Sequence, residues 1–143
     1  MVNDPGVGKR VMPSEVATAM REALSQVVDA GTAKRVAGSF KLPDGTPLAM
    51  GGKTGTGDNR IEAVGSGGRI LSSKSLNRTA TFVFYIGDNH FGTLTAFVPG
   101  RSAESFTFTS ALPVQVLKGM APILTPYLQP GTHTMCNPAT TTA

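Results

Sequence analysis

The chain has 143 residues, enough for one domain of ordinary size, and its 40% hydrophobic and 15% charged residues are typical of a globular protein. The net charge of +4 is spread without any basic run, and two tyrosines with no tryptophan offer no stacking platform, which argues against a nucleic-acid-binding protein. A single cysteine excludes an internal disulfide and a cysteine-based metal site, and no apolar run approaches the roughly 20 residues of a membrane span.

The first predicted element is an amphipathic helix over residues 14–29. Ser14 follows a proline and precedes a glutamate, which is typical of a helix start. Apolar side chains then recur at helical spacing, namely Val16, Met20, Leu24 and Val27. A short second helix is expected over residues 33–38, closed by a glycine, and Pro-Asp-Gly at 43–45 predicts a turn.

Three strands are predicted next. Residues 46–57 should form an extended strand, and residues 58–77, polar and rich in glycine, should form a loop or an irregular hairpin. Residues 79–86 and 93–98 are almost all β-branched or aromatic, and Gly-Asp-Asn at 87–89 should join them as a hairpin. Both faces of the strand at 79–86 are apolar, so we expect it to be covered on both sides.

A last helix is predicted from a second apolar stripe, with a kink at Pro122. Its residues are Leu112, Val116, Met120, Leu124 and Leu128. The order helix, strand, hairpin, helix predicts an α+β fold, in which helices pack on a three-stranded antiparallel sheet. We divide the chain into an N-terminal extension over 1–13, a folded part over 14–128 and an extended tail over 129–143.

Residues 51–57, GGKTGTG, are the clearest candidate for a functional site. A phosphate-binding loop would require glycine where Pro47 stands, and its Lys-Thr should open a helix instead of preceding two further glycines. A glycine-rich turn with a solvated lysine is the simplest alternative.

The motif Lys-Thr-Gly-Thr at 53–56, on a predicted strand ahead of a hairpin and a final helix, resembles the C-terminal part of the transpeptidase domain of penicillin-binding proteins, whose fold is shared with serine β-lactamases. DAGTAKRVAG at 29–38 looks like the segment that leads into this strand in the class A branch of the family. TFVFYIGDN and LTAFVPG look like the two strands that follow it. The resemblance covers roughly residues 14–128.

The resemblance implies a D,D-transpeptidase that crosslinks peptidoglycan by serine acyl transfer, in the periplasm or on the outer face of the cytoplasmic membrane. Lys53 and Thr56 would be catalytic: the lysine would maintain the hydrogen-bond network, and the backbone N–H of Thr56 would form half of an oxyanion hole. Thr54, Gly55 and Thr56 would bind substrate, the threonines by gripping the carboxylate of a stem peptide or a β-lactam. No cofactor is implied. No metal is expected either, because His90 and His133 are 43 residues apart and lack a carboxylate at ligand spacing.

The nucleophile of that family, in a Ser-x-x-Lys motif, is missing, because none of the six lysines has a serine three residues before it. Ser75-Leu76-Asn77 fits the family's Ser-x-Asn motif but follows Lys-Thr-Gly instead of preceding it, so we interpret it as a chance match. We therefore expect an upstream segment of the same parent protein to carry the nucleophile and the membrane anchor. This chain itself should contact neither nucleic acid nor membrane.

Two other interpretations remain open. One is a non-catalytic module that binds a carboxylate or peptide with the same strand. The other is a small structural domain with a glycine turn. Because the apolar faces of residues 79–98 would be partly bare in the isolated chain, we also expect it to associate with another surface.

Overall fold

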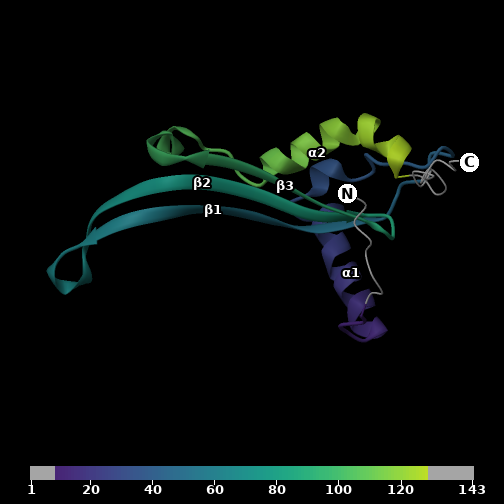
Figure 1. Cartoon of the computed structure of the whole chain (residues 1–143), viewed down its shortest axis with the longest axis horizontal. Helices are drawn as coiled ribbons and strands as arrows, with labels where there is room; N and C mark the ends of the chain where they lie inside the picture. Colours follow the sequence, from purple (N-terminus) through teal and green to yellow (C-terminus); the bar gives the residue numbers. More distant parts are fainter. Residues whose placement is uncertain (1–8, 129–143) are drawn as a thin grey trace, which may run out of the picture.

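The predicted α+β class is confirmed in the computed structural model, which describes residues 9–128 (Figure 1). A three-stranded antiparallel sheet has the order β1-β2-β3, and two α-helices pack against it. Most of the predicted extension at 1–13, the whole tail at 129–143 and His133 lie outside the described residues. None of the helices within 9–128 is long and apolar enough to cross a membrane.

Helix α1 spans Ser14–Asp29, as the sequence predicts. Its C-terminal end meets the sheet, and its N-terminal end projects away on the side opposite to α2 (Figure 1). The guanidinium of Arg21 lies 4.2 Å from the ring centre of Tyr85 and donates to the carbonyl of Gly87 at 2.7 Å. The Tyr85 hydroxyl donates to the Arg21 carbonyl at 3.0 Å. These contacts fix the helix to the end of β2, although most of its length is exposed to solvent.

The second predicted helix is only a 3-10 turn, η1, over Lys34–Val36, since the chain turns at Gly38 with a φ of 65°. The predicted Pro-Asp-Gly turn is confirmed. Gly45 has a φ of 87°, and the Asp44 carboxylate accepts the Thr46 N–H at 2.8 Å. Hydrogen bonds from Thr46 lower the pKa of Asp44 below its usual value.

The strands are longer than the sequence predicts. β1 spans Met50–Val64, β2 spans Ile70–Ile86 and β3 spans His90–Pro99. The predicted strand over 46–57 is therefore wrong at both ends, while the two later strands and their tight turn are confirmed.

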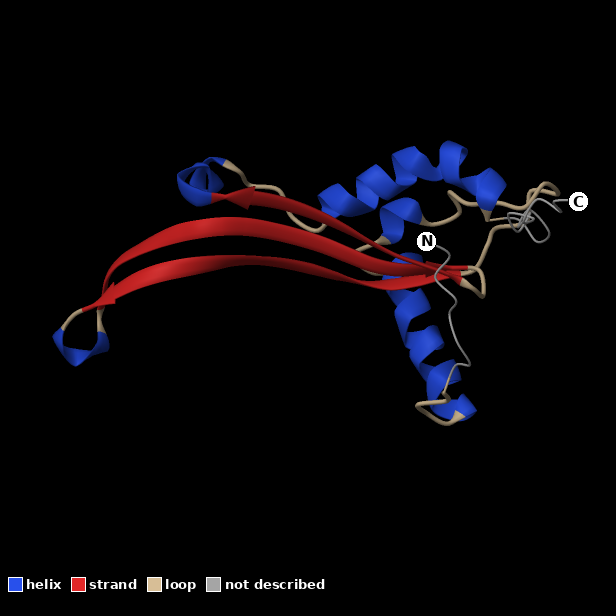
Figure 2. Ribbon diagram, in the orientation of Figure 1, coloured by secondary structure: helices blue, strands red, loops and turns tan. Residues whose placement is uncertain are grey.

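Of the two alternatives for residues 58–77, the loop is wrong and the irregular hairpin is right. β1 and β2 pair continuously through this region, apart from register shifts at Asn59/Arg60 and Ala63/Val64. The 3-10 turn η2, Ser66–Gly68, closes the ribbon. Figure 2 shows it as the long two-stranded extension that leaves the body of the molecule. The ribbon is largely exposed to solvent, so its sequence lacks the apolar alternation that marks a strand covered on one face.

The core lies between one face of the sheet and helix α2, Ala111–Leu124. The predicted apolar stripe of α2 is right only in part. Leu112 and Val116 are exposed, whereas Val114, Leu117 and Ala121 are buried. Leu124 and Leu128, at the end of the predicted stripe, do pack against the core. The helix is apolar on more than one side, so spacing alone could not choose the buried side. It continues past Pro122 before passing into the 3-10 turn η4, Thr125–Tyr127. Between β3 and α2 the chain forms another 3-10 segment, η3, over Gly100–Ser105.

The two faces of the sheet are covered unequally. On the face toward α2, Phe82 and Ile86 are buried in the core. On the other face, Tyr85 is covered by α1, but three large side chains remain exposed, namely Val83 (51%), Phe91 (74%) and Phe97 (56%). The prediction that both faces are covered is therefore wrong away from α1, because that helix crosses only one end of the strands.

Candidate functional site

The Lys-Thr-Gly-Thr motif lies on β1, which is an edge strand of the sheet. Thr54 is opposite Phe82 of β2 in the strand register, and Thr56 is opposite Ala80 of β2. Both of these partners are fully buried. Because side chains alternate along a strand, both threonines face the core side of the sheet, and Lys53 faces the opposite side together with the position of Gly55. The motif thus presents groups on both faces of one exposed edge.

Lys53 is exposed, and its ammonium group donates to the carbonyl of Thr54 at 2.6 Å. It forms no ion pair with any residue in 9–128, where the two ion pairs are Arg21–Asp88 and Arg60–Asp58. The lysine also lines a small apolar hollow of about 160 Å³ with residues of α1, β1, β2 and β3. The other lining residues are Leu24, Gly52, Val83, Phe84, Tyr85 and Phe91. A positive charge without a carboxylate partner thus stands beside an apolar surface.

Thr54 is only 7% exposed, and its hydroxyl is hydrogen bonded to the hydroxyl of Thr32 at 2.6 Å. Thr32 lies in the connection between α1 and η1, so this bond attaches that connection to the edge strand. A carboxylate ligand would have to compete with Thr32 for this hydroxyl.

Thr56 is exposed, and its Oγ1 accepts the backbone N–H of Ser110 at 2.8 Å. Ser110 is the N-cap of α2, so this N–H belongs to the helix start and has no carbonyl partner within the helix. A hydroxyl oxygen that accepts this bond keeps its own proton for another acceptor. Of the two threonines, Thr56 is therefore the one suited to donate to an anion. Sequence reasoning did not find Ser110, which is 54 residues away.

The four glycines of residues 51–57 fall into two groups. A Cβ on Gly51 would lie 2.6 Å from Cζ of Tyr85, and one on Gly52 would lie 2.6 Å from Cε2 of Phe82, so these positions need glycine for packing. A Cβ on Gly55 or Gly57 would meet nothing within 4 Å. The first two glycines therefore serve the fold, and the last two leave the strand open to an approaching group.

The polar residues around the motif form a structural network. Asp58 pairs with Arg60 at 2.7 Å on the surface. Ser75, of the Ser-x-Asn match, donates its hydroxyl to Asp58 at 3.2 Å, while the Asn77 side chain accepts the Asn59 N–H at 3.2 Å. Both residues of the match thus hold β2 against β1.

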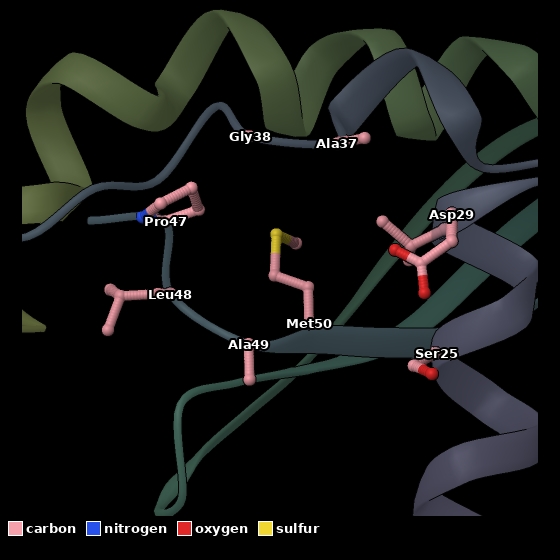
Figure 3. Close-up of a pocket in the computed structure, with 9 residues that line it drawn as sticks. Ser25, Asp29, Ala37, Gly38, Pro47, Leu48, Ala49 and Met50 are labelled. Carbon is pink, nitrogen blue, oxygen red and sulfur yellow. The ribbon is translucent and has the colours of Figure 1, made fainter. Parts of the chain in front are cut away.

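A second hollow, of about 290 Å³, lies beside the start of β1 (Figure 3). Ser25 and Asp29 of α1 supply its polar side chains, and Figure 3 shows Met50 between them and Pro47 and Leu48 on the far side. None of the residues of the Lys-Thr-Gly-Thr motif lines it. Within the described residues 9–128 no group of three His, Cys, Asp or Glu side chains is placed to hold a metal ion.

Comparisons of the chain with protein-family models, curated proteins and solved structures give no match. The candidate site therefore depends on the motif and on the geometry described above.

Proposed function

We propose that this chain is the C-terminal part of a penicillin-binding D,D-transpeptidase, whose serine nucleophile lies on an upstream segment of the same parent protein. The observation that carries the proposal is the placement of Lys-Thr-Gly-Thr on an exposed edge strand, followed in order by two antiparallel strands and a helix that packs on them. This is the arrangement that the motif requires for a peptide or β-lactam to lie along the strand.

The geometry suits a ligand that carries a carboxylate. The uncompensated charge of Lys53 and the free hydroxyl proton of Thr56 both attract an anion, and both belong to the edge strand. The open space over Gly55 lets a substrate backbone approach β1 without meeting a side chain. The backbone N–H of Thr56 would then complete the oxyanion hole together with a donor of the upstream segment.

Exposed apolar side chains and an unpaired strand edge support the proposal that an upstream segment packs on this chain. Val16 and Met20 are exposed on the projecting part of α1, and Val83 and Phe91 are exposed on the sheet face that Lys53 shares. The outer edge of β3 is also unpaired among the described residues. Apolar side chains and an open strand edge of this extent are typical of an interface. An upstream segment that covered them would bring its serine to the side of Lys53.

Labelling with a fluorescent penicillin tests the proposal. The isolated chain should show no stoichiometric mass increase in intact-mass spectrometry, because acyl transfer needs a serine with an adjacent base. The product of the longer reading frame should be acylated on an upstream serine, and Lys53→Ala should lower its second-order acylation rate strongly. Lys118→Ala, which removes an exposed lysine of α2 outside the motif, is the matched control. An adduct on the isolated chain, or an unchanged rate in the Lys53 variant, would contradict the proposal.

A non-catalytic binding module is the second candidate. It is favoured by the observation that no serine within residues 9–128 is hydrogen bonded to a lysine side chain. The two candidates differ in the upstream reading frame. A Ser-x-x-Lys motif followed by Ser-x-Asn supports the enzyme, and the absence of both supports the module.

A further inference from the structure

The long hairpin carries an apolar tip that the candidate site does not use. We call residues 58–76 the arm. β3 pairs with β2 only as far as Asn77, so the arm continues as a ribbon of two strands beyond the body of the molecule (Figure 2). Two-stranded ribbons are marginally stable in water and generally need a further contact.

One face of the arm is held by a polar network. Asp58 binds Arg60 and Ser75, and the Ser73 hydroxyl connects Arg60 to Glu62 through contacts of 3.4 Å. The network pairs the charge of Arg60 with that of Asp58. Since side chains alternate along β1, the same face carries Val64 after Glu62, so the polar network ends where the apolar tip begins.

The end of the arm is apolar and exposed. Its large apolar side chains are Ile61 (60% exposed), Val64 (59%), Ile70 (53%) and Leu71 (67%). Val64 and Ile70 are opposite one another in the register, and Leu71 lies over Gly65, where a Cβ would be 3.0 Å from its Cδ1. The closing turn is Gly65-Ser-Gly-Gly68, so no bulky side chain stands in front of this cluster.

Two cations flank the apolar cluster. Arg69 immediately precedes Ile70, and Lys74 is opposite Ile61 in the register. Neither forms an ion pair with a residue in 9–128. Two carboxylates without a cationic partner lie near these positive charges: that of Glu62, in the polar network, and that of Glu104 in η3, which accepts the Ser75 N–H at 3.3 Å. Residues 61–74 thus carry two cations and one carboxylate, a net charge of +1, beside the apolar side chains, and anionic membrane surfaces attract this combination.

We propose that the arm docks on an anionic lipid bilayer, with its apolar tip in the headgroup layer. This contact does not need the apolar run of a spanning segment, on whose absence the expectation of no membrane contact was based. A second copy of the chain fits the tip less well. Four side chains that are about six-tenths exposed offer roughly 400 Å², about half of the area per partner that a stable dimer buries.

Vesicle binding by the full chain tests the docking. Wild type should sediment with phosphatidylglycerol/phosphatidylcholine vesicles, much less with pure phosphatidylcholine, and less as salt is added. The double variant Ile70→Ser, Leu71→Ser should partition about tenfold less, because the inserted apolar area is lost. Ile123→Ser, which removes an apolar side chain of α2 that is 69% exposed, is the matched control and should bind like wild type.

A fluorescent reporter keeps the test independent of that variant. Since the chain has no tryptophan, Leu71→Trp places a single indole at the tip, and Ile123→Trp places one on α2. Anionic vesicles should shift the emission of the tip reporter to the blue, and brominated lipid should quench it, with neither effect for the α2 reporter. The proposal would be overturned if wild type failed to bind vesicles or if the double variant bound them equally well. It would also be overturned if wild type formed dimers in solution and the double variant were monomeric.

Discussion

Gly52 and Gly55 lie on the same strand, three residues apart, and we expect opposite effects when each is replaced by alanine. In Gly52→Ala the new methyl group would lie 2.6 Å from the ring of Phe82 and even closer to the Val83 carbonyl. Phe82 is fully buried and the carbonyl belongs to the paired strand, so neither can move away without loss of packing. Gly55→Ala meets nothing within 4 Å, and Gly55 has no positive φ.

The difference between the two variants isolates the packing cost. Replacing glycine by alanine lowers the entropy of the unfolded chain by about the same amount at both positions, roughly 0.4–1 kcal/mol, which stabilises the protein. Overpacking at Gly52 costs about 1–3 kcal/mol in the free energy of unfolding. Gly55→Ala should therefore be neutral or slightly stabilising, and Gly52→Ala should be about 1–3 kcal/mol less stable than it.

Equilibrium urea unfolding of both variants, followed by circular dichroism, measures this difference. Thermal unfolding should show Gly52→Ala melting roughly 4–12 °C below Gly55→Ala. Equal midpoints would refute the division of the motif into packing glycines and open glycines. If the division holds, a loss of ligand binding in Gly55→Val of the longer protein would report on the site and not on the fold.

Three further predictions concern contacts that hold the site in place. Thr32→Val should cost about 1–3 kcal/mol of unfolding free energy, because it leaves the buried hydroxyl of Thr54 without its partner. Thr54→Val should cost less, because Thr32 is exposed and its hydroxyl can bind water instead. In a double-mutant cycle by urea unfolding, the double variant should cost clearly less than the sum of the two. Arg21→Ala should speed hydrogen exchange in α1, measured by mass spectrometry, because the helix loses the guanidinium contacts with the Tyr85 ring and the Gly87 carbonyl; unchanged exchange would show that other contacts hold it. Asp44→Ala should be less stable than wild type at neutral pH, and the difference should vanish in acid. Because the folded-state pKa of Asp44 is lowered, its carboxylate stabilises the fold above about pH 3.8 and loses this effect as pH falls through the folded-state pKa. Urea unfolding across pH 2–6 would show the change.

The elements that the sequence predicted correctly are those whose signal is local. The helix Ser14–Asp29 has a proline and serine at its start and apolar residues at helical spacing, and both features act within one turn of the helix. The strands around the 87–89 turn are equally clear, because β-branched and aromatic residues fill both sides of a tight turn. Their predicted boundaries were short, because β2 already begins at Ile70 and β3 spans His90–Pro99.

The elements that the sequence could not predict depend on what lies next to them. The arm has polar residues along both strands and forms because β1 and β2 leave the sheet already paired, which local composition does not reveal. The buried side of α2 was mistaken because Val114 and Val116 are equally apolar, and only the position of the helix over the sheet selects one of them. Coverage of the sheet likewise depends on where α1 crosses it.

The candidate site shows the same limit more sharply. The sequence motif could identify Lys53 and Thr56 as polar residues on a strand, but it could not identify the hydrogen-bond partners that distinguish Thr54 from Thr56. Those partners are Thr32, 22 residues before the first threonine, and Ser110, 54 residues after the second. One hydroxyl is thereby engaged in the core and the other is held with its proton free. Because Lys53 faces the opposite side of the sheet, these groups can act on one ligand only if it lies along the edge of β1, where the two faces meet.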